Sequence, residues 1–244
     1  MLKSIVRYSL ALGLLLQVAS CSGQSRVNEQ KKELVMIDLV KRTIEQAHYD
    51  PKEFNDEFSK EAFDEYFKQL DVFKRFFTQD DIKSLRKYET LLDDELKAYD
   101  FNFFNATNEM YVKNIARANK MCFEILEKPF DFNVKESYEL DPDKRSYPKN
   151  EKELYEAWRL SLKYEVITRL ASLIEAQEKK KFDPEKKEGN PKTLAELEAE
   201  AREKVTKRYK DWFHELDKLE RADRLADYVN SLMAVLDPHS NFFP

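Results

Sequence analysis

Three residues that could do chemistry together lie near the C-terminal end of the chain, where Asp237, His239 and Ser240 fall within four positions. These are the residue types of a hydrolase triad, in which a serine oxygen bonds one imidazole nitrogen and a carboxylate bonds the other. Triads draw their members from distant segments, and residues this close around Pro238 tend to point in diverging directions. The spacing favours a proline turn in which His239 and Ser240 bond nearby backbone groups, with a hydrolase as the alternative.

The remaining histidines do not predict a metal site. His48 precedes a proline at the end of a helical pattern, where a capping or helix-dipole contact is expected, and His214 lies within DWFHELDK. A metal site needs three or four converging donors, often two at a short helical spacing, and no HxxxH or CxxC occurs. The three glycines form no phosphate-binding motif. We therefore expect no metal, no cofactor and no catalytic residue in this chain.

The two cysteines receive different interpretations. Cys21 follows a basic start and an apolar run over residues 10–18, which is typical of a signal peptide and too short for an ordinary membrane-spanning helix. Residues 18–21 (VASC) resemble the bacterial lipobox, which implies cleavage before Cys21 and lipid attachment to its sulfur. The alternative is a plain signal peptide with a chance cysteine. Cys122 then has no disulfide partner, and we expect it to pack as a small apolar residue.

Charge and glycine content restrict the class of protein. The formal net charge is −5, from 42 lysines and arginines against 47 aspartates and glutamates. The two signs are interspersed as on solvated helix faces, and no basic stripe occurs, so we expect no nucleic-acid partner. Only three glycines are present, which favours helices over strands and tight turns.

The elements that would position these residues are predicted by apolar residues at helical spacing. They indicate an all-α body of about six to eight helices. Helix starts are expected at Thr78, at Asn150 with Glu153, and at Thr193 with Glu196, because these pairs can cap the first turn. The expected helical segments are residues 34–47, 58–71, 78–97, 103–126, 150–180 and a final part from 193, with a buried stripe formed by Trp212, Leu216, Leu219, Leu225, Val229, Leu232 and Leu236.

Two segments interrupt the helical pattern. Residues 129–149 (PFDFNVKESYELDPDKRSYPK) hold three prolines and several aromatics without a helical period. We expect an extended crossing that lies on the helical body, because its aromatics need burial, and a short strand could form within it. Residues 181–192 are charged and contain Pro184, Gly189 and Pro191, which predicts an exposed loop.

Five motifs occur in order along the chain. They are Phe63-Asp64-x-Tyr66-x-x-x-Leu70-Asp71 with Phe76-Phe77-x-x-Asp80-Asp81-Ile82, residues 126–132 (LEKPFDF), residues 147–154 (YPKNEKEL) with Trp158, Arg208-Tyr209, and residues 236–244 (LDPHSNFFP). Together they resemble the tail-specific protease family, the carboxy-terminal processing peptidases, and the resemblance covers roughly residues 35–244. Lys207 stands where the family has an arginine, and Ser240, Phe242 and Pro244 stand where it has Thr, Tyr and Ser.

This resemblance implies that the region is an N-terminal helical domain. In the family it leads into a PDZ-like domain that captures substrate C-termini, and then into a serine protease domain with a Ser/Lys dyad. No residue of this chain matches either of those domains. With the lipobox-like start, the expected organisation is a lipoprotein signal peptide at 1–20, a tether at 21–28, the helical domain at 29–236 and a junction at 237–244 toward a missing PDZ-like domain.

The favoured interpretation is a non-catalytic scaffold, a fragment of such a protease facing the periplasm and held at a membrane through Cys21. Ser22 follows that cysteine instead of the aspartate that retains some lipoproteins in the inner membrane, which favours the outer membrane. The expected partners are protein substrates or envelope adaptor proteins, reached through the full-length parent. The alternative is a stand-alone, lipid-anchored helical adaptor or binding module.

Overall fold

A computed structural model of the protein describes residues 33–35, 37–38, 41–42, 53–181 and 190–236, and most of these residues are helical. No strand occurs among them, so the prediction of an all-α domain is confirmed. The helices are α2 (Asp56–Leu70), α3 (Gln79–Leu85), the 3-10 turn η1 (Arg86–Tyr88), α4 (Leu92–Ala98), α5 (Asn102–Leu126), the 3-10 turn η2 (Pro142–Lys144), α6 (Glu151–Lys181), α7 (Leu194–Lys218) and α8 (Arg221–Leu236).

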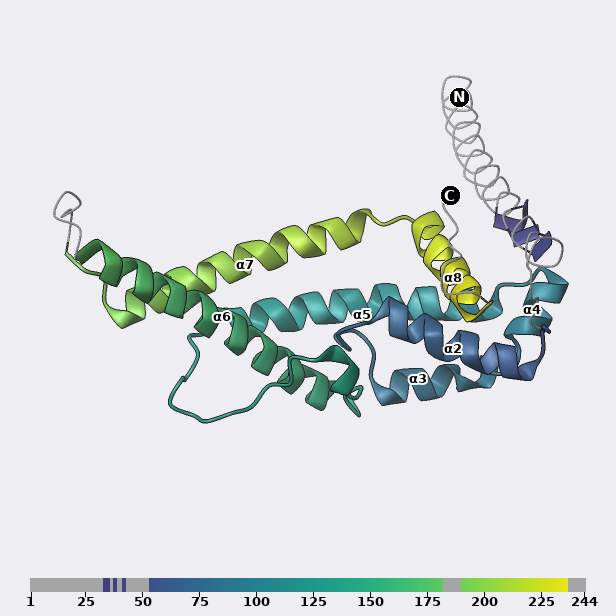
Figure 1. Ribbon diagram of the computed structural model, residues 1–244, viewed down its shortest axis with the longest axis horizontal. Helices are drawn as coiled ribbons and strands as arrows, with labels where there is room; N and C mark the ends of the chain where they lie inside the picture. The colour runs from purple at the N-terminus through teal and green to yellow at the C-terminus, as the bar shows by residue number, and fades with distance from the viewer. Residues whose placement is uncertain (1–32, 36, 39–40, 43–52, 182–189, 237–244) are drawn as a thin grey trace, which may run out of the picture.

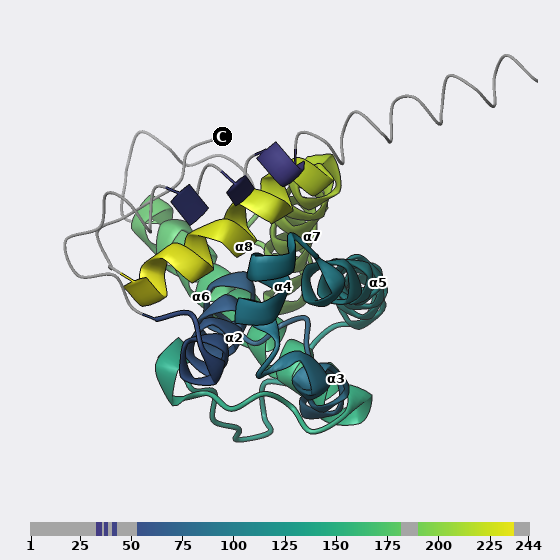
Figure 2. The ribbon, with the colours of Figure 1, turned by 90° about the vertical axis from the view of Figure 1, so that its right-hand side faces the viewer.

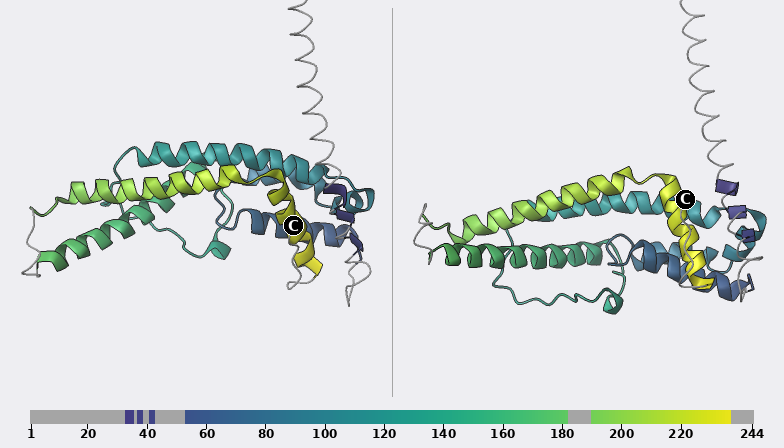
Figure 3. Two further views of the ribbon diagram at one scale, coloured as in Figure 1. Left: turned by 90° about the horizontal axis from the view of Figure 1, so that it is seen from above. Right: turned by 45° about the horizontal axis from the view of Figure 1, so that its top comes forward.

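The helices form an elongated body (Figure 1). At one end α2 packs against α8 and α4, and α3 packs against α5. Toward the other end α6 and α7 run side by side as an antiparallel pair (Figure 3). Helix α5 contacts α3 and α8 as well as α6 and α7, so it joins the two ends. Figure 2 shows α2, α3, α4 and α8 gathered at the near end of the body.

Aromatic rings fill much of the core. Tyr66 from α2 lies edge-on to Phe103 of α5 and to Tyr228 of α8, with ring centroids 5.6 and 5.3 Å apart. Between α6 and α7, Trp158 packs against Tyr209 and Phe213 at 5.7 and 6.2 Å. Each buried aromatic side chain contributes roughly 1.5–3 kcal/mol by leaving water. One cluster of aromatic rings therefore stabilises the end formed by α2, α5 and α8, and a second cluster stabilises the α6–α7 pair.

The predicted helix starts are confirmed. Thr193 and Glu196 form a reciprocal capping box at the start of α7. Thr78 does the same with Asp81 at the start of α3. At the start of α6 the Asn150 side chain accepts the main-chain N–H of Glu153 at 3.1 Å. Short-range sequence signals were sufficient here because both partners of each cap lie within one helical turn.

The continuous helix expected over residues 78–97 is wrong. Helix α3 ends at Leu85, and α4 begins at Leu92 after the turn η1. The break lets α4 lie against α2, where Asp93 accepts a hydrogen bond from the Ser59 hydroxyl at 2.6 Å. Leu92 is fully buried in the same contact. Burial against a neighbouring helix therefore overrides the local helical pattern.

The apolar stripe expected near the C-terminal end is also divided. Helix α7 ends at Lys218 and α8 begins at Arg221, turning so that α8 packs on α2. Leu219 lies in this connection and is 37% exposed, so its assignment to a buried stripe is wrong. Leu225, Val229 and Leu232 are buried as expected.

The segment between α5 and α6, residues 127–150 (called the crossing below), lies on the helical body and contains the turn η2 but no strand. Its aromatic side chains at Phe130, Phe132 and Tyr147 are partly buried against the core, as expected. In a separate finding, no helix within the described residues is long and apolar enough to span a bilayer.

Candidate functional site

Most residues that the sequence singled out lie outside the described part of the chain. These are the lipidation site Cys21, His48, and the cluster Asp237, His239 and Ser240. The lipid anchor and the proline junction therefore stay predictions. The described part of the chain has its polar and charged contacts at other residues, in the α2–α3 turn and along the crossing.

The structure places two of the singled-out residues, His214 and Cys122. His214 is exposed on α7. Cys122 is fully buried in α5, as expected for a packing residue, and burial raises the pKa of its thiol to about 12. Among the described residues, no three His, Cys, Asp or Glu side chains are placed to hold a metal ion.

The turn between α2 and α3 is organised by the buried carboxylate of Asp71. Its Oδ1 accepts the main-chain N–H of Arg75 at 2.7 Å, and its Oδ2 accepts those of Phe76 and Phe77, both at 2.9 Å. Burial raises the pKa of Asp71, and these three N–H groups oppose that rise. Lys74 adopts a left-handed backbone conformation with φ 51°, which the bonds on either side of it hold in place.

The N-terminus of α3 is satisfied by the end of the crossing. The main-chain N–H of Gln79 donates to the carbonyl oxygen of Pro148 at 2.8 Å, and that of Asp80 to Lys149 at 3.4 Å. The third N–H, that of Asp81, is taken by the Thr78 hydroxyl at 3.1 Å. Helix starts leave such donors open, so this geometry explains why Pro148 and Lys149 must lie beside α3.

Helix α6 is joined to the same turn by an aromatic and charged group. The guanidinium of Arg75 lies over the rings of Trp158 and Tyr209, 5.4 and 5.9 Å from their centroids. Its Nη2 donates to the Ser161 hydroxyl at 3.1 Å and to Glu165 at 3.4 Å. Tyr209 of α7 donates its hydroxyl to the same Glu165 at 2.7 Å. The group therefore ties the turn to both long helices.

The end of α5 is held by Arg202 of α7. Its Nη1 donates to the carbonyl oxygens of Leu126 and Glu127 at 2.9 and 3.4 Å, which are among the open acceptors of a helix end. Glu198 accepts a bond from Arg202 Nε at 3.0 Å and orients the side chain. A cation at this position also interacts favourably with the α5 dipole.

The outer side of the crossing is fixed to α6 through Glu136. Its carboxylate pairs with Arg159, and with Lys163 Nζ at 2.5 Å. Lys163 also donates to the carbonyl oxygen of Val134 at 3.2 Å. These two cations, Arg159 first, lower the pKa of Glu136 to about 2. The crossing is therefore bonded at both ends and in its middle.

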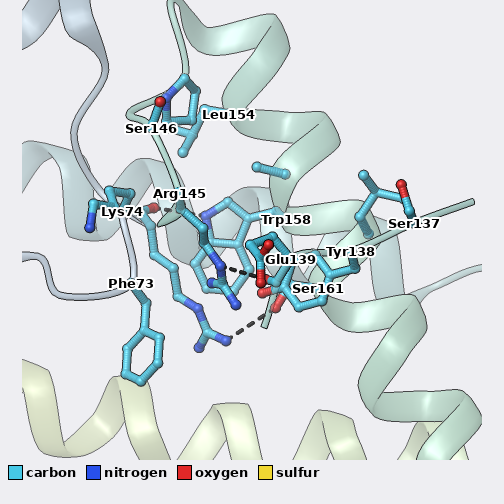
Figure 4. A pocket seen from close by; sticks show the side chains of 14 residues that line it. Phe73, Lys74, Ser137, Tyr138, Glu139, Arg145, Ser146, Leu154, Trp158 and Ser161 are labelled. Carbon is cyan, nitrogen blue, oxygen red and sulfur yellow. Dashed lines mark hydrogen bonds between the residues drawn. The ribbon is translucent and has the colours of Figure 1, made fainter. Parts of the chain in front are cut away.

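A cavity of about 230 Å³ remains between the crossing, the α2–α3 turn and the first half of α6. Figure 4 shows Arg145 reaching in from the crossing, Phe73 from the turn, and Trp158 and Ser161 from α6. The Arg145 guanidinium lies 4.5 Å from the Tyr138 ring centroid and 5.9 Å from that of Phe73. The cavity thus combines cations with aromatic surface.

The residues that build this region were not singled out from the sequence as a site. The motifs around Asp71, Asp81 and Trp158 were visible as motifs, yet Asp81 and Trp158 have partners tens of positions away. Arg75, for example, stands 83 residues from Trp158, to which it is bonded. A signal did exist for Asp71, because a single acid before an apolar pair can accept successive main-chain N–H groups.

Comparison with known proteins identifies the source of these motifs. A sequence profile described as "Tail specific protease N-terminal domain" matches residues 40–244. A "Tail-specific protease" from Haemophilus influenzae is 26% identical over 200 residues, which cover 82% of this chain and 26% of that protein. This chain thus spans only about a quarter of that relative. With the matched profile covering most of its length, the chain belongs to the tail-specific protease N-terminal domain family.

Proposed function

We propose that residues 29–236 act as the non-catalytic scaffold of a larger serine protease that processes proteins from their C-termini with a Ser/Lys dyad. The observation that carries this proposal is the role of the family motifs in the fold. Asp71 accepts main-chain N–H groups of the turn that joins α2 to α3, and Asp81 of α3 pairs with Arg117 of α5 at 2.9 Å. Trp158 of α6 donates to the main-chain carbonyl oxygen of Arg75 in the α2–α3 turn. Residues used in this way support a rigid body and leave chemistry to other domains.

The described serines give this proposal further support. The Ser161 hydroxyl accepts from Arg75, and the Ser59 hydroxyl donates to Asp93. Both are engaged in holding helices together.

The test of the non-catalytic role is direct. The full chain is incubated with C-terminally labelled peptides and with ester substrates, beside a Ser240→Ala variant. We expect no hydrolysis above background from either protein. Hydrolysis by the full chain that disappears in Ser240→Ala would overturn the proposal and support a hydrolase built on Asp237, His239 and Ser240.

The larger protease is tested at the level of its gene. The proposal expects the reading frame to continue past codon 244 into PDZ-like and protease domains. A stop codon there, without such domains, would favour the alternative of a stand-alone adaptor or binding module. That alternative has some support in the apolar side chains that the crossing leaves open, since Val134 and Leu140 are 51% and 54% exposed.

We further propose that the protein faces the periplasm and that lipid on Cys21 anchors it in a membrane. Of the two membranes, the outer membrane is favoured. The support is the lipobox-like sequence VASC at residues 18–21 followed by Ser22. Mass spectrometry of the mature N-terminus tests this, with Cys21→Ser as the control. An unmodified Cys21, or an intact residue 1–20 segment, would contradict it. Protein substrates and envelope adaptors are the partners proposed for the assembled protease.

A further inference from the structure

We infer that the cavity between the crossing and α6 binds a carboxylate carried by a polypeptide, an activity separate from the scaffold role proposed above. The cavity is about 230 Å³ in volume. Pockets for whole small-molecule ligands are larger, roughly 300–1,000 Å³. The space therefore suits one side chain or one chain end, with the rest of the ligand outside.

The charge of the cavity favours an anion. Three cations line it, Lys74, Arg75 and Arg145, against one acid, Glu139. Lys74 Nζ donates to the carbonyl oxygen of Pro142 at 2.6 Å, and Arg145 Nε to that of Glu139 at 2.7 Å. Those acceptors carry no net charge, and neither cation is ion-paired with a carboxylate in the described part of the chain. The positive charge is therefore available to a ligand.

Arg75 adds a positive charge whose position is already fixed. Its guanidinium is held by aromatic rings and by Ser161 and Glu165, so little side-chain freedom remains to be lost on binding. Its Nε has no hydrogen-bond partner in the described structure, but this atom is buried. The side chain therefore contributes its charge at the wall of the cavity, and Arg145 and Lys74 supply the donors that a ligand can reach.

The rings beside these cations specify an apolar neighbour for the carboxylate. Phe73 lines the cavity and is 49% exposed. The ring centroids of Tyr138 and Phe73 lie 4.5 and 5.9 Å from the Arg145 guanidinium. A ligand side chain placed here would cover Phe73 while its carboxylate met Arg145. The expected ligand is therefore a peptide in which a carboxylate stands next to an aromatic or aliphatic residue.

The main chain of the crossing favours a polypeptide over a free anion. Within the described structure, residues 132–140 make no main-chain hydrogen bond to another main-chain group. Side chains occupy the Asn133 N–H and the carbonyl oxygens of Val134, Glu139 and Leu140. The main-chain groups of residues 135–138, beside the cavity, make no hydrogen bond within the described structure and are open to an extended peptide that adds alongside, as in strand addition to an open edge. A phosphate ion would use the cations alone and leave this edge and the rings unused.

The experiment measures binding of short fluorescent peptides to the full chain in mild detergent. The first peptide carries an internal Asp-Phe and an amidated end, and the second ends in Phe with a free carboxylate. A neutral peptide has Asn-Phe and an amidated end. We expect at least one anionic peptide to bind about tenfold or more tightly than the neutral one, and more weakly as salt is raised. Whichever anionic peptide binds more tightly shows whether the cavity recognises an Asp side chain or the C-terminal carboxylate of a chain.

Variants locate the binding in the cavity. Arg145→Gln should weaken the anionic peptide about tenfold. Lys135→Gln makes the same change of charge on the exposed side of the crossing and should leave binding unchanged. Arg145→Gln could weaken binding only by loosening the crossing, so a second variant reverses the charge. Arg145→Glu should bind a Lys-Phe peptide and should no longer bind the acidic peptide. Circular dichroism checks that each variant is folded.

Four outcomes would overturn the inference. They are no binding of either anionic peptide, equal binding of the neutral peptide, unchanged binding in a folded Arg145→Gln variant, and competition by inorganic phosphate at the same concentration as the peptide. None of these affects the scaffold proposal, which the hydrolysis assay and the reading frame test separately.

Discussion

Trp158 donates its indole N–H to the main-chain carbonyl oxygen of Arg75 at 2.9 Å, across 83 positions of sequence. The same tryptophan ring lies beneath the guanidinium of that arginine, 5.4 Å from centroid to Cζ. One side chain therefore fixes both the backbone and the side chain of Arg75. Because Arg75 belongs to the α2–α3 turn and Trp158 to α6, this pair determines how the two halves of the body meet.

Replacing Trp158 with phenylalanine should lower the free energy of unfolding by about 2–4 kcal/mol. The change removes the donor from a partly buried carbonyl oxygen and leaves unfilled volume around the buried ring. Urea unfolding followed by circular dichroism measures it. Trp212→Phe is the matched control, because Trp212 is only partly buried in the same aromatic cluster and has no hydrogen-bond partner among the described residues. Equal losses in the two variants would contradict the importance of the Trp158–Arg75 bond.

Asp71→Asn should destabilise the protein by about 3 kcal/mol. An asparagine keeps the shape but loses the charge that three main-chain N–H groups bond to, and its own NH₂ group meets one of those donors. Urea unfolding again gives the value. Asp211→Asn, on the exposed face of α7, removes the same charge and should change stability little. A loss under 1 kcal/mol for Asp71→Asn would be inconsistent with the turn described above.

The contribution of Glu136 should depend on pH. Arg159 and Lys163 lower the pKa of its carboxyl from 4.5 to about 2. A group whose pKa is lowered by folding stabilises the fold above its unfolded pKa, and that stabilisation is lost as pH falls through the folded value. The stability difference between the natural protein and Glu136→Gln should therefore shrink between pH values of about 4.5 and about 2.

Acid titration of unfolding midpoints measures this difference. In a background that carries both Arg159→Gln and Lys163→Gln, the pH-dependent part should disappear, because the two cations are its cause. A difference that keeps its size across the window, or that survives in this background, would contradict the assignment.

Thr193→Ala should cost about 1 kcal/mol, the usual effect of losing an N-cap. The Thr193 side chain accepts from the main-chain N–H of Glu196, and Glu196 accepts from that of Thr193 at 2.7 Å. Thr193→Ser keeps the hydroxyl and serves as the control, so it should lose only a few tenths of that amount. Thermal unfolding that is the same for both variants would show that the capping box contributes nothing.

Cys122 should resist alkylation in the native protein. It is fully buried, and burial raises its thiol pKa to about 12, so almost no thiolate forms near neutral pH. The chain contains two cysteines, so a Cys21→Ser variant leaves Cys122 as the single thiol to be followed. Iodoacetamide labelling at pH 8 should require urea. Rapid labelling without urea would contradict the burial of this side chain.

The features that could be predicted from the sequence are those set by residues close together along the chain, such as helix starts. Thr193 with Glu196 and Asn150 with Glu153 define helix starts because each pair lies within one turn. The break after Leu85 escaped prediction because its cause lies elsewhere, in the contact of Asp93 with Ser59 on α2. A helical period reports which face is apolar, and it carries no information on where a partner helix forces the chain to bend.

The candidate site was harder to predict than the fold. Arg75 and Arg145 are ordinary cations in a chain with 42 lysines and arginines, and nothing in their neighbourhood marks them. Their meaning comes from Trp158, Tyr138 and Phe73, which three separate segments bring together. The family motifs pointed to the right region through Asp71 and Trp158. They could not say that these residues bond to main chain, because that requires the packed structure.

The end of the crossing has a mechanical consequence. The carbonyl oxygens of Pro148 and Lys149 close the N-terminus of α3, while Asn150 directly afterwards starts α6. A movement of α6 away from α3 would therefore leave the first N–H groups of α3 without these acceptors, which costs free energy. A pulling force on α6 would be transmitted through this joint to α3.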